Sequence, residues 1–330
     1  MEIGTEKEPF LHSAIITLYG QPKSIDLPIF GAKVLACYMC KLDMHGAPRV
    51  AWTLLRETAY PGTNLIRLMD SVNWPVGPKI VIATTDFESP LSSHSEVATV
   101  AEVLENGQAV RLRDVRVCSS YSNSGAPTNC TKRDVLTWPH LGETRFFDNR
   151  VLEFRAEVAL LSRNIIVQGD SDDALCPNAD IADDGVTRLS CNQYGTGGLF
   201  FHSPGHESLV GRISNIEVRN AGQSFRLGRY AIHWHMVGNL RNSFQRNCSI
   251  HHSWNRGTAV HGVNYLRLEN NFVYSVMGHA FFIEDGVEEY NFLMGNVGIK
   301  VLPSMNLLNT DQVSKGSTFT KNARFGIFNC

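Results

Sequence analysis

Histidine and carboxylate side chains gather in one stretch of the sequence. Residues 231–262 hold five of the twelve histidines, in the segments AIHWHMVGNL and SIHHSWNRGTAVHG. Glu284 and Asp285 follow soon after in FFIEDG. Imidazoles and carboxylates are the groups that hold divalent metals and that transfer protons in acid–base catalysis. Either chemistry requires a fold that brings these residues together.

Short β-type runs predict an all-β protein. Runs of apolar and β-branched residues lie between turn formers, as in SAIITLYG, KIVIATT and GRISNIEVRNAG. No stretch of about 12 residues shows helical periodicity. From about residue 209 onward similar units recur, and Ile232, Val260 and Ile283 align at spacings of 28 and 23 residues. Such periods suit the coils of a parallel β-helix, here with long loop excursions.

A parallel β-helix would place the histidines and an acid in one ladder. Alternate residues of a strand face opposite ways, so His233 and His235 are predicted to point outward together. Stacked coils lie about 4.8 Å apart. We therefore expect His233, His261 and Glu284 to be neighbours from three successive coils.

Three interpretations of this ladder remain open. A dyad of His261 and Glu284 could donate and accept a proton in glycosidic bond cleavage, with Asp285 as a second carboxylate if the chain turns there. A divalent metal, calcium or a transition metal, could instead bind four candidate ligands: His233, His235, His261 and Glu284. Their spacing does not fix which metal. In the third interpretation the histidines only hold the coils in register.

Other residues are candidates for ligand binding. The rings of Trp254 and Tyr274 could stack on sugars, and the guanidinium groups of Arg229 and Arg256 could contact an acidic sugar. The acidic loop at residues 169–198 offers oxygen ligands for calcium, although it lacks the ligand spacing of an EF-hand. The predicted partner is therefore a polysaccharide or an extracellular matrix glycan.

The eight cysteines indicate an exported protein, because disulfides persist in oxidising compartments. Two pairs bracket polar, turn-rich loops and are predicted disulfides: Cys118 with Cys130, and Cys176 with Cys191. Cys37 and Cys40 have the spacing of a redox or zinc motif, but no second cysteine pair accompanies them. We expect ordinary strand cysteines there.

Asparagines recur at predicted coil corners. Asn247, Asn271 and Asn296 are expected to stack and to hydrogen-bond from coil to coil. Asn129 and Asn247 also begin glycosylation sequons. The stacking interpretation is favoured at Asn247, because a glycosylated side chain must face solvent.

Charge and hydropathy exclude some partners. The net charge is −2, with acidic and basic residues interspersed, so nucleic acid is not expected as a partner. No run of about 18 apolar residues occurs, so this chain is expected to have no membrane segment. Its first residues lack the features of a signal peptide.

Several long motifs resemble a known family. LGRYAIHWHMVGN, SIHHSWNRGTAVHG, GHAFFIEDGVEEYN and RAEVALLSRNIIVQG resemble the β-helix region of the fibrocystin-L family, which is shared with hyaluronan-acting relatives. EIGTEKEPFLHSAIITLYG is similar to the last strands of the eight-glycine domain that precedes that β-helix. The resemblance implies a right-handed β-helix and an extracellular or cell-surface location. It also implies that the chain is a fragment of a larger protein. Whether that larger protein has a membrane anchor is left open.

The resemblance and the repeat together divide the chain into three parts. Residues 1–20 are expected to be the last strands of an eight-glycine-type domain, residues 21–208 irregular β-helix coils with long loops, and residues 209–330 regular coils continuous with them. The implied function is a module that contacts carbohydrate or matrix. The alternatives are a glycosidase that depolymerises hyaluronan or a related polysaccharide, and a structural ectodomain spacer.

Overall fold

The computed structural model describes residues 1–19, 25–87, 93–121, 127–170, 198–204, 208–223 and 227–302, without the side chains of residues 117–121 and 127–129. Its chain divides into two compact units. One comprises Met1–Ala47 with Asn164–Cys330, and the other comprises Pro48–Arg163. Within the described ranges, no helix is both long and apolar enough to cross a bilayer.

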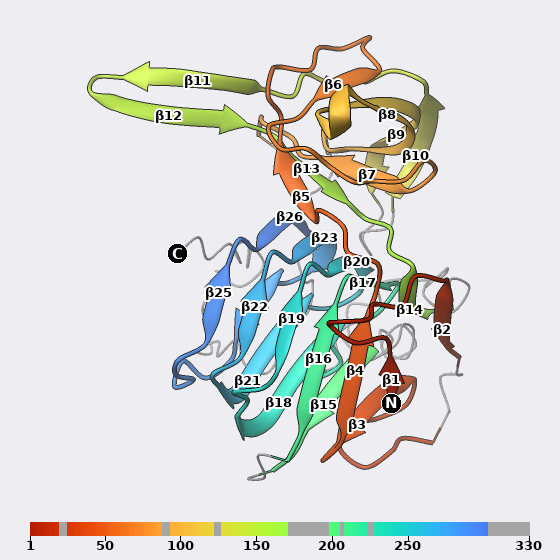
Figure 1. Ribbon diagram of the computed structural model, residues 1–330, viewed down its shortest axis with the longest axis vertical. Helices are drawn as coiled ribbons and strands as arrows, with labels where there is room; N and C mark the ends of the chain where they lie inside the picture. Colours follow the sequence, from red (N-terminus) through yellow and green to blue (C-terminus); the bar gives the residue numbers. More distant parts are fainter. Residues whose placement is uncertain are drawn as a thin grey trace, which may run out of the picture. The chain divides into compact units, whose positions relative to one another are not determined.

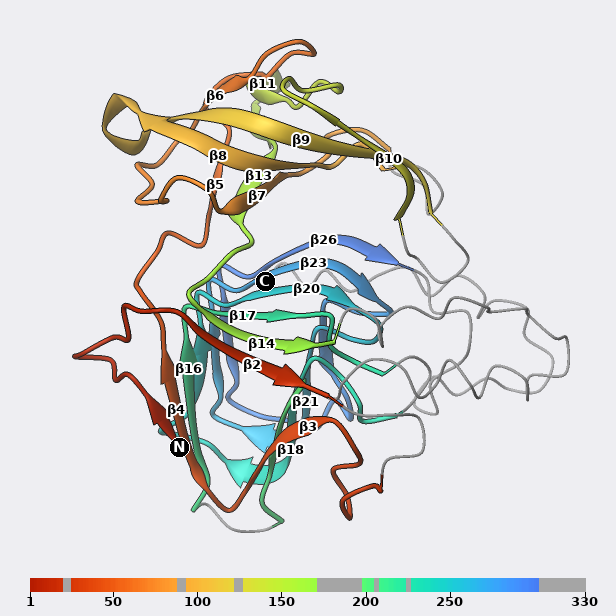
Figure 2. The same ribbon diagram turned by 90° about the vertical axis from the view of Figure 1, so that its right-hand side faces the viewer.

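The first unit is a parallel β-helix with three sheets (Figures 1 and 2). The first sheet contains β1 (Glu2–Ile3), β4 (Lys41–His45), β16 (Val210–Ser214), β19 (Phe244–Arg246), β22 (Arg267–Glu269) and β25 (Phe292–Met294). The second contains β2 (Ala14–Leu18), β14 (Ile165–Gly169), β17 (Ile216–Arg219), β20 (Ser249–Ser253), β23 (Phe272–Met277) and β26 (Val297–Leu302). The third contains β3 (Val34–Tyr38), β15 (Gly198–His202), β18 (Ile232–Asn239), β21 (Thr258–Asn264) and β24 (Phe281–Ile283). Neighbouring strands pair in parallel, which confirms the predicted fold class.

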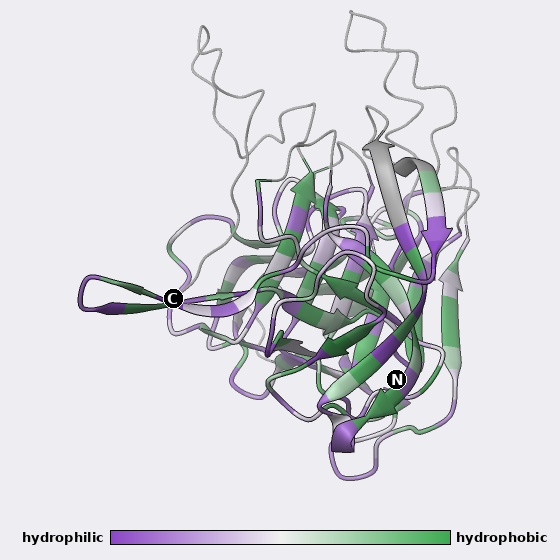
Figure 3. Ribbon diagram, turned by 90° about the horizontal axis from the view of Figure 1, so that it is seen from above, coloured by the Kyte–Doolittle hydropathy of each residue, from purple (hydrophilic) through white to green (hydrophobic). Residues whose placement is uncertain are grey.

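Apolar side chains from the three sheets fill the inside of the coils. Ile213 from the first sheet, Val218 from the second and Trp234 from the third are fully buried in one core. The strands that enclose it carry many hydrophobic residues, drawn green in Figure 3. This alternation of inward apolar residues is what the repeat in the sequence reflects.

The register differs by two residues from the expected alignment. Ile232, Val260 and Ile283 do lie on the adjacent strands β18, β21 and β24, but Val260 stands opposite Trp234 rather than Ile232. A slip of two residues leaves the same side chains facing inward. The hydrophobic pattern therefore cannot distinguish the two registers.

The asparagine ladder contains two of its three expected members. Asn271 Nδ2 donates to Asn296 Oδ1 at 2.9 Å, and Asn271 Oδ1 accepts the backbone N–H of Cys248 at 3.1 Å. Asn247 precedes Cys248 at a corner with a left-handed backbone, and Asn270 precedes Asn271 at another. Their φ angles are 50° and 53°. Asparagine tolerates this backbone region better than most residues do.

The second unit differs from the expected β-helix coils. Its main sheet is antiparallel, with β5 (Trp52–Leu54), β6 (Leu65–Arg67), β7 (Lys79–Ile82), β8 (Glu96–Leu104), β9 (Ala109–Tyr121), β10 (Pro127–Arg133) and β13 (Glu157–Leu160). A 3-10 turn, η1 (Glu105–Gly107), joins β8 to β9. A separate hairpin consists of β11 (Gly142–Phe147) and β12 (Arg150–Arg155). Half-buried strands alternate in the same way in parallel and antiparallel sheets, so the sequence pattern did not reveal this unit.

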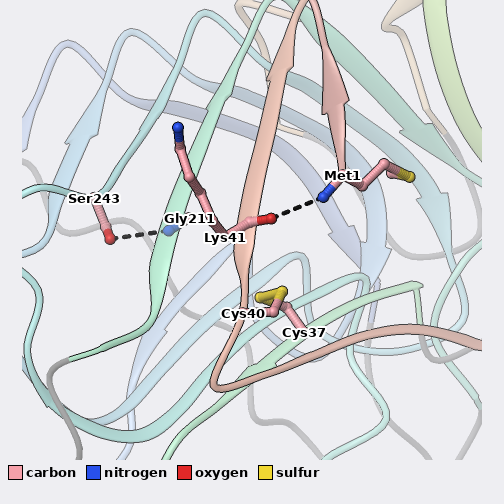
Figure 4. Close-up of a disulfide and its surroundings, with 6 residues drawn as sticks. All are labelled: Met1, Cys37, Cys40, Lys41, Gly211 and Ser243. Carbon is pink, nitrogen blue, oxygen red and sulfur yellow. Dashed lines mark hydrogen bonds between the residues drawn. A yellow bond between two sulfur atoms is a disulfide. The ribbon is translucent and has the colours of Figure 1, made fainter.

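The cysteine pairs have different outcomes. Cys37 and Cys40 form a disulfide (Figure 4), which corrects the expectation of ordinary strand cysteines. Met39 turns the chain between them with a φ of 48°, so the two Cα atoms lie 5.3 Å apart. The β9–β10 register places Cys118 opposite Cys130, which is itself disulfide-bonded, and both observations support the predicted pair. Cys176 and Cys191 lie outside the described residues.

Candidate functional site

The predicted cluster lies on the outward face of the sheet formed by β15, β18, β21 and β24. His233 and His235 alternate with fully buried core residues along β18, as strand geometry requires. His202, His235 and His261 stand opposite one another on three adjacent strands. The direct neighbour of His261 is therefore His235. His233 lies two residues before His235 on the same strand, and its side chain faces the same way.

A β-bulge follows the cluster in β18. The pairing register shifts between His235 and Gly238, and Met236 has a φ of 51° there. On the next coil, Gly262 follows His261 with a φ of 59°, and a Cβ at Gly262 would lie 2.7 Å from the Met236 sulfur. Glycine therefore allows the coils to approach closely beside the site.

His233 is a neutral imidazole with one unpaired nitrogen. Its Nδ1 lies 2.9 Å from the Gly228 carbonyl oxygen. A carbonyl only accepts, so Nδ1 carries the proton and donates it. Burial lowers the pKa of His233 well below the ordinary value, and the neighbouring His235 lowers it further. The remaining nitrogen, Nε2, is buried and has no hydrogen-bond partner.

His235 lies between two other imidazoles. Burial lowers its pKa to about 3, with further contributions from His261, His202 and Arg229. Its Nδ1 is 2.9 Å from His202 Nδ1. His202 was not among the predicted site residues, although GLFFH has the same alternation as AIHWH. Aligning those two segments would have placed His202 opposite His235.

Two consecutive carboxylates approach the same imidazole. Asp285 Oδ2 lies 3.0 Å from His261 Nε2, and Glu284 Oε2 lies 3.7 Å from His261 Nδ1. In a continued strand these two acids would face opposite ways. Strand β24 ends at Ile283, and Gly286 has a φ of 72°, so the chain turns and brings Asp285 round.

The two carboxyl groups have different surroundings. The Glu284 side chain is 5% exposed, whereas the Asp285 side chain is 47% exposed. Burial raises the pKa of Glu284 above its ordinary value. Glu288 fixes the turn, because its Oε1 accepts the backbone N–H groups of Gly262 at 3.0 Å and Asp285 at 3.2 Å. One acid is therefore buried and the other faces solvent.

The two candidate arginines have different positions. Arg229 is half-buried beside the cluster, with its guanidinium carbon 6.0 Å from the centre of the Phe200 ring. Arg256 is fully buried. It donates to the Tyr230 hydroxyl at 2.8 Å and lies 3.6 Å over the Phe282 ring. Of these two, only Arg229 is placed where a ligand could reach it.

The two candidate aromatic rings are not brought to the cluster strands. Tyr274 lies on β23, in a different sheet, and is 4% exposed. Trp254 is half-buried in the link between β20 and β21. Its indole Nε1 is buried and has no hydrogen-bond partner. Neither ring is presented as an exposed stacking surface beside the histidines.

Three imidazoles have the arrangement of metal ligands. His233, His235 and His261 each offer one nitrogen, and these nitrogens lie within 4.8 Å of one another. Glu284 does not belong to this group within the described part of the chain, so the four predicted ligands reduce to three. The acidic loop considered for calcium lies outside the described residues from 171 to 197.

Comparisons with known proteins agree with the fold. Residues 196–327 match the CEMIP beta-helix family model, and residues 1–56 match the G8 domain, a longer range than the predicted residues 1–20. The tailspike of Pseudomonas phage phi297 aligns with 83% of this chain and 39% of its own, at 10% identity and a TM-score of 0.23.

Two curated relatives define the kinship. Fibrocystin-L of Homo sapiens is 38% identical over 94% of this chain, which spans 7% of that protein's length. Cell surface hyaluronidase CEMIP2 of Homo sapiens is 28% identical over 82% of this chain and 17% of its own length. Both the G8 match and the CEMIP beta-helix match occur in the expected order along the chain. The chain therefore carries G8 and CEMIP β-helix domains and is similar to fibrocystin-L over nearly its whole length.

Proposed function

We propose that this chain is an extracellular or cell-surface β-helix module that contacts a polysaccharide. The observation that carries the proposal is the outward cluster of imidazoles and carboxylates on β18, β21 and the turn after β24, with Arg229 beside it. A cation and several hydrogen-bonding groups on one face suit an acidic sugar. The name of the related cell surface hyaluronidase supports a hyaluronan-like ligand, and the Cys37–Cys40 disulfide supports an oxidising compartment.

Binding to size-defined hyaluronan and to a panel of other glycosaminoglycans tests this proposal. Arg229→Gln should weaken binding about tenfold, because it removes one charge-assisted hydrogen bond. Arg56→Gln is the matched control, since Arg56 is an exposed arginine of the other unit. Lack of affinity for every glycan would contradict the proposal and would favour a structural spacer.

A second candidate function is a glycosidase that depolymerises hyaluronan or a related polysaccharide. The observation that favours it is the approach of Glu284 and Asp285 to opposite nitrogens of His261. Glycoside hydrolysis uses one carboxylic acid that protonates the leaving oxygen and one carboxylate that acts as base or nucleophile. The buried Glu284 suits the acid and the exposed Asp285 suits the carboxylate.

Incubation with size-defined hyaluronan, followed by measurement of chain length with and without a chelator, separates enzyme from binder. If the chain is an enzyme, Glu284→Gln and Asp285→Asn should each slow cleavage about 100-fold or more. Glu289→Gln should leave the rate unchanged, because Glu289 is an exposed acid in the same turn that does not approach His261. Unchanged chain length under both conditions would exclude the glycosidase and leave the binding module.

A further inference from the structure

We infer that His233, His235 and His261 form a binding site for one transition-metal ion of the zinc class. The inference does not depend on glycan binding, because it concerns only these three side chains and their immediate partners. Strand β18 supplies two imidazoles at alternate positions, and β21 supplies the third from the next coil. The three donors therefore come from rigid, paired strands rather than from loops.

The spacing of the nitrogens fits a metal after small side-chain rotations. One nitrogen from each ring lies within 4.8 Å of the others. Zinc binds imidazole nitrogen at about 2.0–2.1 Å, so two nitrogens on a tetrahedral ion lie about 3.4 Å apart. The His233 and His261 rings each have their centres 4.8 Å from the His235 ring centre. Rotation of partly exposed His235 and His261 would close the remaining gap.

The state of His233 suits a metal ligand. Its Nδ1–H donates to the Gly228 carbonyl, which leaves a bare lone pair on Nε2. That nitrogen is buried and has no hydrogen-bond partner, and a buried polar atom in this state is unfavourable. A histidine that donates its other N–H to a carbonyl is the usual arrangement of a metal ligand. A bound cation would satisfy this lone pair.

The other two imidazoles also have partners for their second nitrogens. His261 Nε2 lies 3.0 Å from the Asp285 carboxylate, so Nδ1, which faces Glu284 Oε2 at 3.7 Å, remains for a metal. His202 Nδ1 lies 3.1 Å from the His235 carbonyl oxygen and 2.9 Å from His235 Nδ1, so it donates its proton and His235 Nδ1 accepts. Coordination through His235 Nε2 would therefore require the proton on that nitrogen to move to Nδ1, with a matching change of tautomer at His202. Imidazole donors without carboxylate oxygens favour zinc and its transition-metal neighbours over calcium or magnesium. Three protein ligands also leave the fourth position of the ion open to water or a ligand.

Titration of the chelator-stripped 330-residue chain with Zn²⁺ and with Co²⁺ tests the inference. We expect one equivalent per chain and a visible absorption band for the tetrahedral Co²⁺ form. Loss of a hydrogen-bond partner of a metal ligand lowers metal affinity roughly 10- to 100-fold. His233→Gln and His261→Gln remove ligands themselves, so each should weaken metal binding by more than that. His202→Gln removes only a partner of His235, so it should weaken metal binding by no more than about 10- to 100-fold. His12→Gln is the matched control, because His12 is exposed and lies on neither cluster strand.

Folding and glycan binding are measured separately from metal binding. His261 is 23% exposed, so His261→Gln is the variant expected to keep the circular dichroism spectrum of the unaltered chain. Lack of a stoichiometric metal in the unaltered chain would overturn the inference. Unaltered affinity in folded His261→Gln would also overturn it. Metal binding without glycan binding would support this inference while contradicting the proposed function.

Discussion

At the scale of single residues, environment decides the chemistry more than residue type does. Glu284 and Asp285 are neighbours in sequence, yet one is almost fully buried and the other is half exposed. The sequence predicted Glu284 near His261, and Asp285 there only if the chain turns. That turn depends on the end of β24 and on the positive φ of Gly286, and a local turn of this kind leaves no periodic signal in the sequence.

Glu157 provides a prediction at this scale. Burial raises the pKa of Glu157 above its ordinary value, so its contribution to stability is present below the unfolded-state pKa and is lost as pH rises through the folded-state pKa. Glu157→Gln should therefore raise the urea midpoint at pH 7 and have little effect near pH 4. Glu153→Gln is the control, because Arg155 and Thr144 lower the pKa of Glu153. A stabilising effect of both substitutions at pH 7 would contradict this explanation.

At the scale of elements, the repeat predicts the coils but not their register. Inward alternation has a period of two, so a two-residue slip costs nothing in the pattern. GLFFH follows the long segment between β14 and β15 and precedes residue 209, where the regular repeat was expected to begin. The repeat therefore does not indicate His202, although His202 stands opposite His235.

A partly buried ion pair joins β4 to β16. Arg212 approaches Asp43 with two nitrogens, at 2.6 and 2.9 Å. Burial raises the pKa of Asp43, but Arg212 and Lys41 outweigh it and lower the pKa overall. Asp43→Asn should reduce the free energy of unfolding by about 1–2 kcal/mol at pH 7, because the partly exposed Arg212 loses a charge-assisted hydrogen-bond partner.

The pH dependence gives the check on this pair. A lowered folded-state pKa contributes stability above the unfolded-state pKa, and the contribution is lost as pH falls through the folded-state value. The difference between Asp43→Asn and the unaltered chain in urea unfolding should therefore shrink as pH falls below about 4. A difference that is constant from pH 7 to pH 3 would show that the carboxylate charge is not the cause.

The asparagine ladder gives a second prediction at this scale. Asn271 is fully buried and bonds to Asn296, to the Gln245 carbonyl oxygen and to the Cys248 N–H. Asn271→Ala should cost about 1–3 kcal/mol, because buried backbone groups lose their partners. Asn247→Gly should cost less, because glycine readily adopts the φ of 50° at that corner. Equal losses in thermal unfolding would contradict the assignment of the ladder.

At the scale of the whole molecule, the fold class could be predicted because coil repeats accumulate over many residues. The antiparallel unit could not, because its strands alternate like those of the β-helix. The chain leaves the β-helix after Ala47 and returns at Asn164, whose Oδ1 accepts the Ala47 N–H at 2.8 Å. The two points of exit and return are therefore adjacent.

This closure predicts that the β-helix folds without residues 48–163. Replacing them by a short Gly-Ser linker between Ala47 and Asn164 should preserve the β-sheet circular dichroism spectrum and the binding of one metal equivalent, because the cluster strands are unchanged. Asn164→Ala in the shortened chain should lower its thermal stability, since Asn164 Nδ2 also donates to the Phe10 and His12 carbonyl oxygens. Aggregation of the shortened chain with Asn164 intact would contradict the prediction.

The junction between the end of β4 and the start of β14 also has a consequence for how the protein evolves. A solenoid that opens and recloses at one point can acquire, lose or exchange an entire domain by recombination while its other rungs keep their contacts. Paralogues could thus diversify at this junction independently of the outward histidines. The inserted domain and the imidazole face would then evolve as separate modules under separate selection.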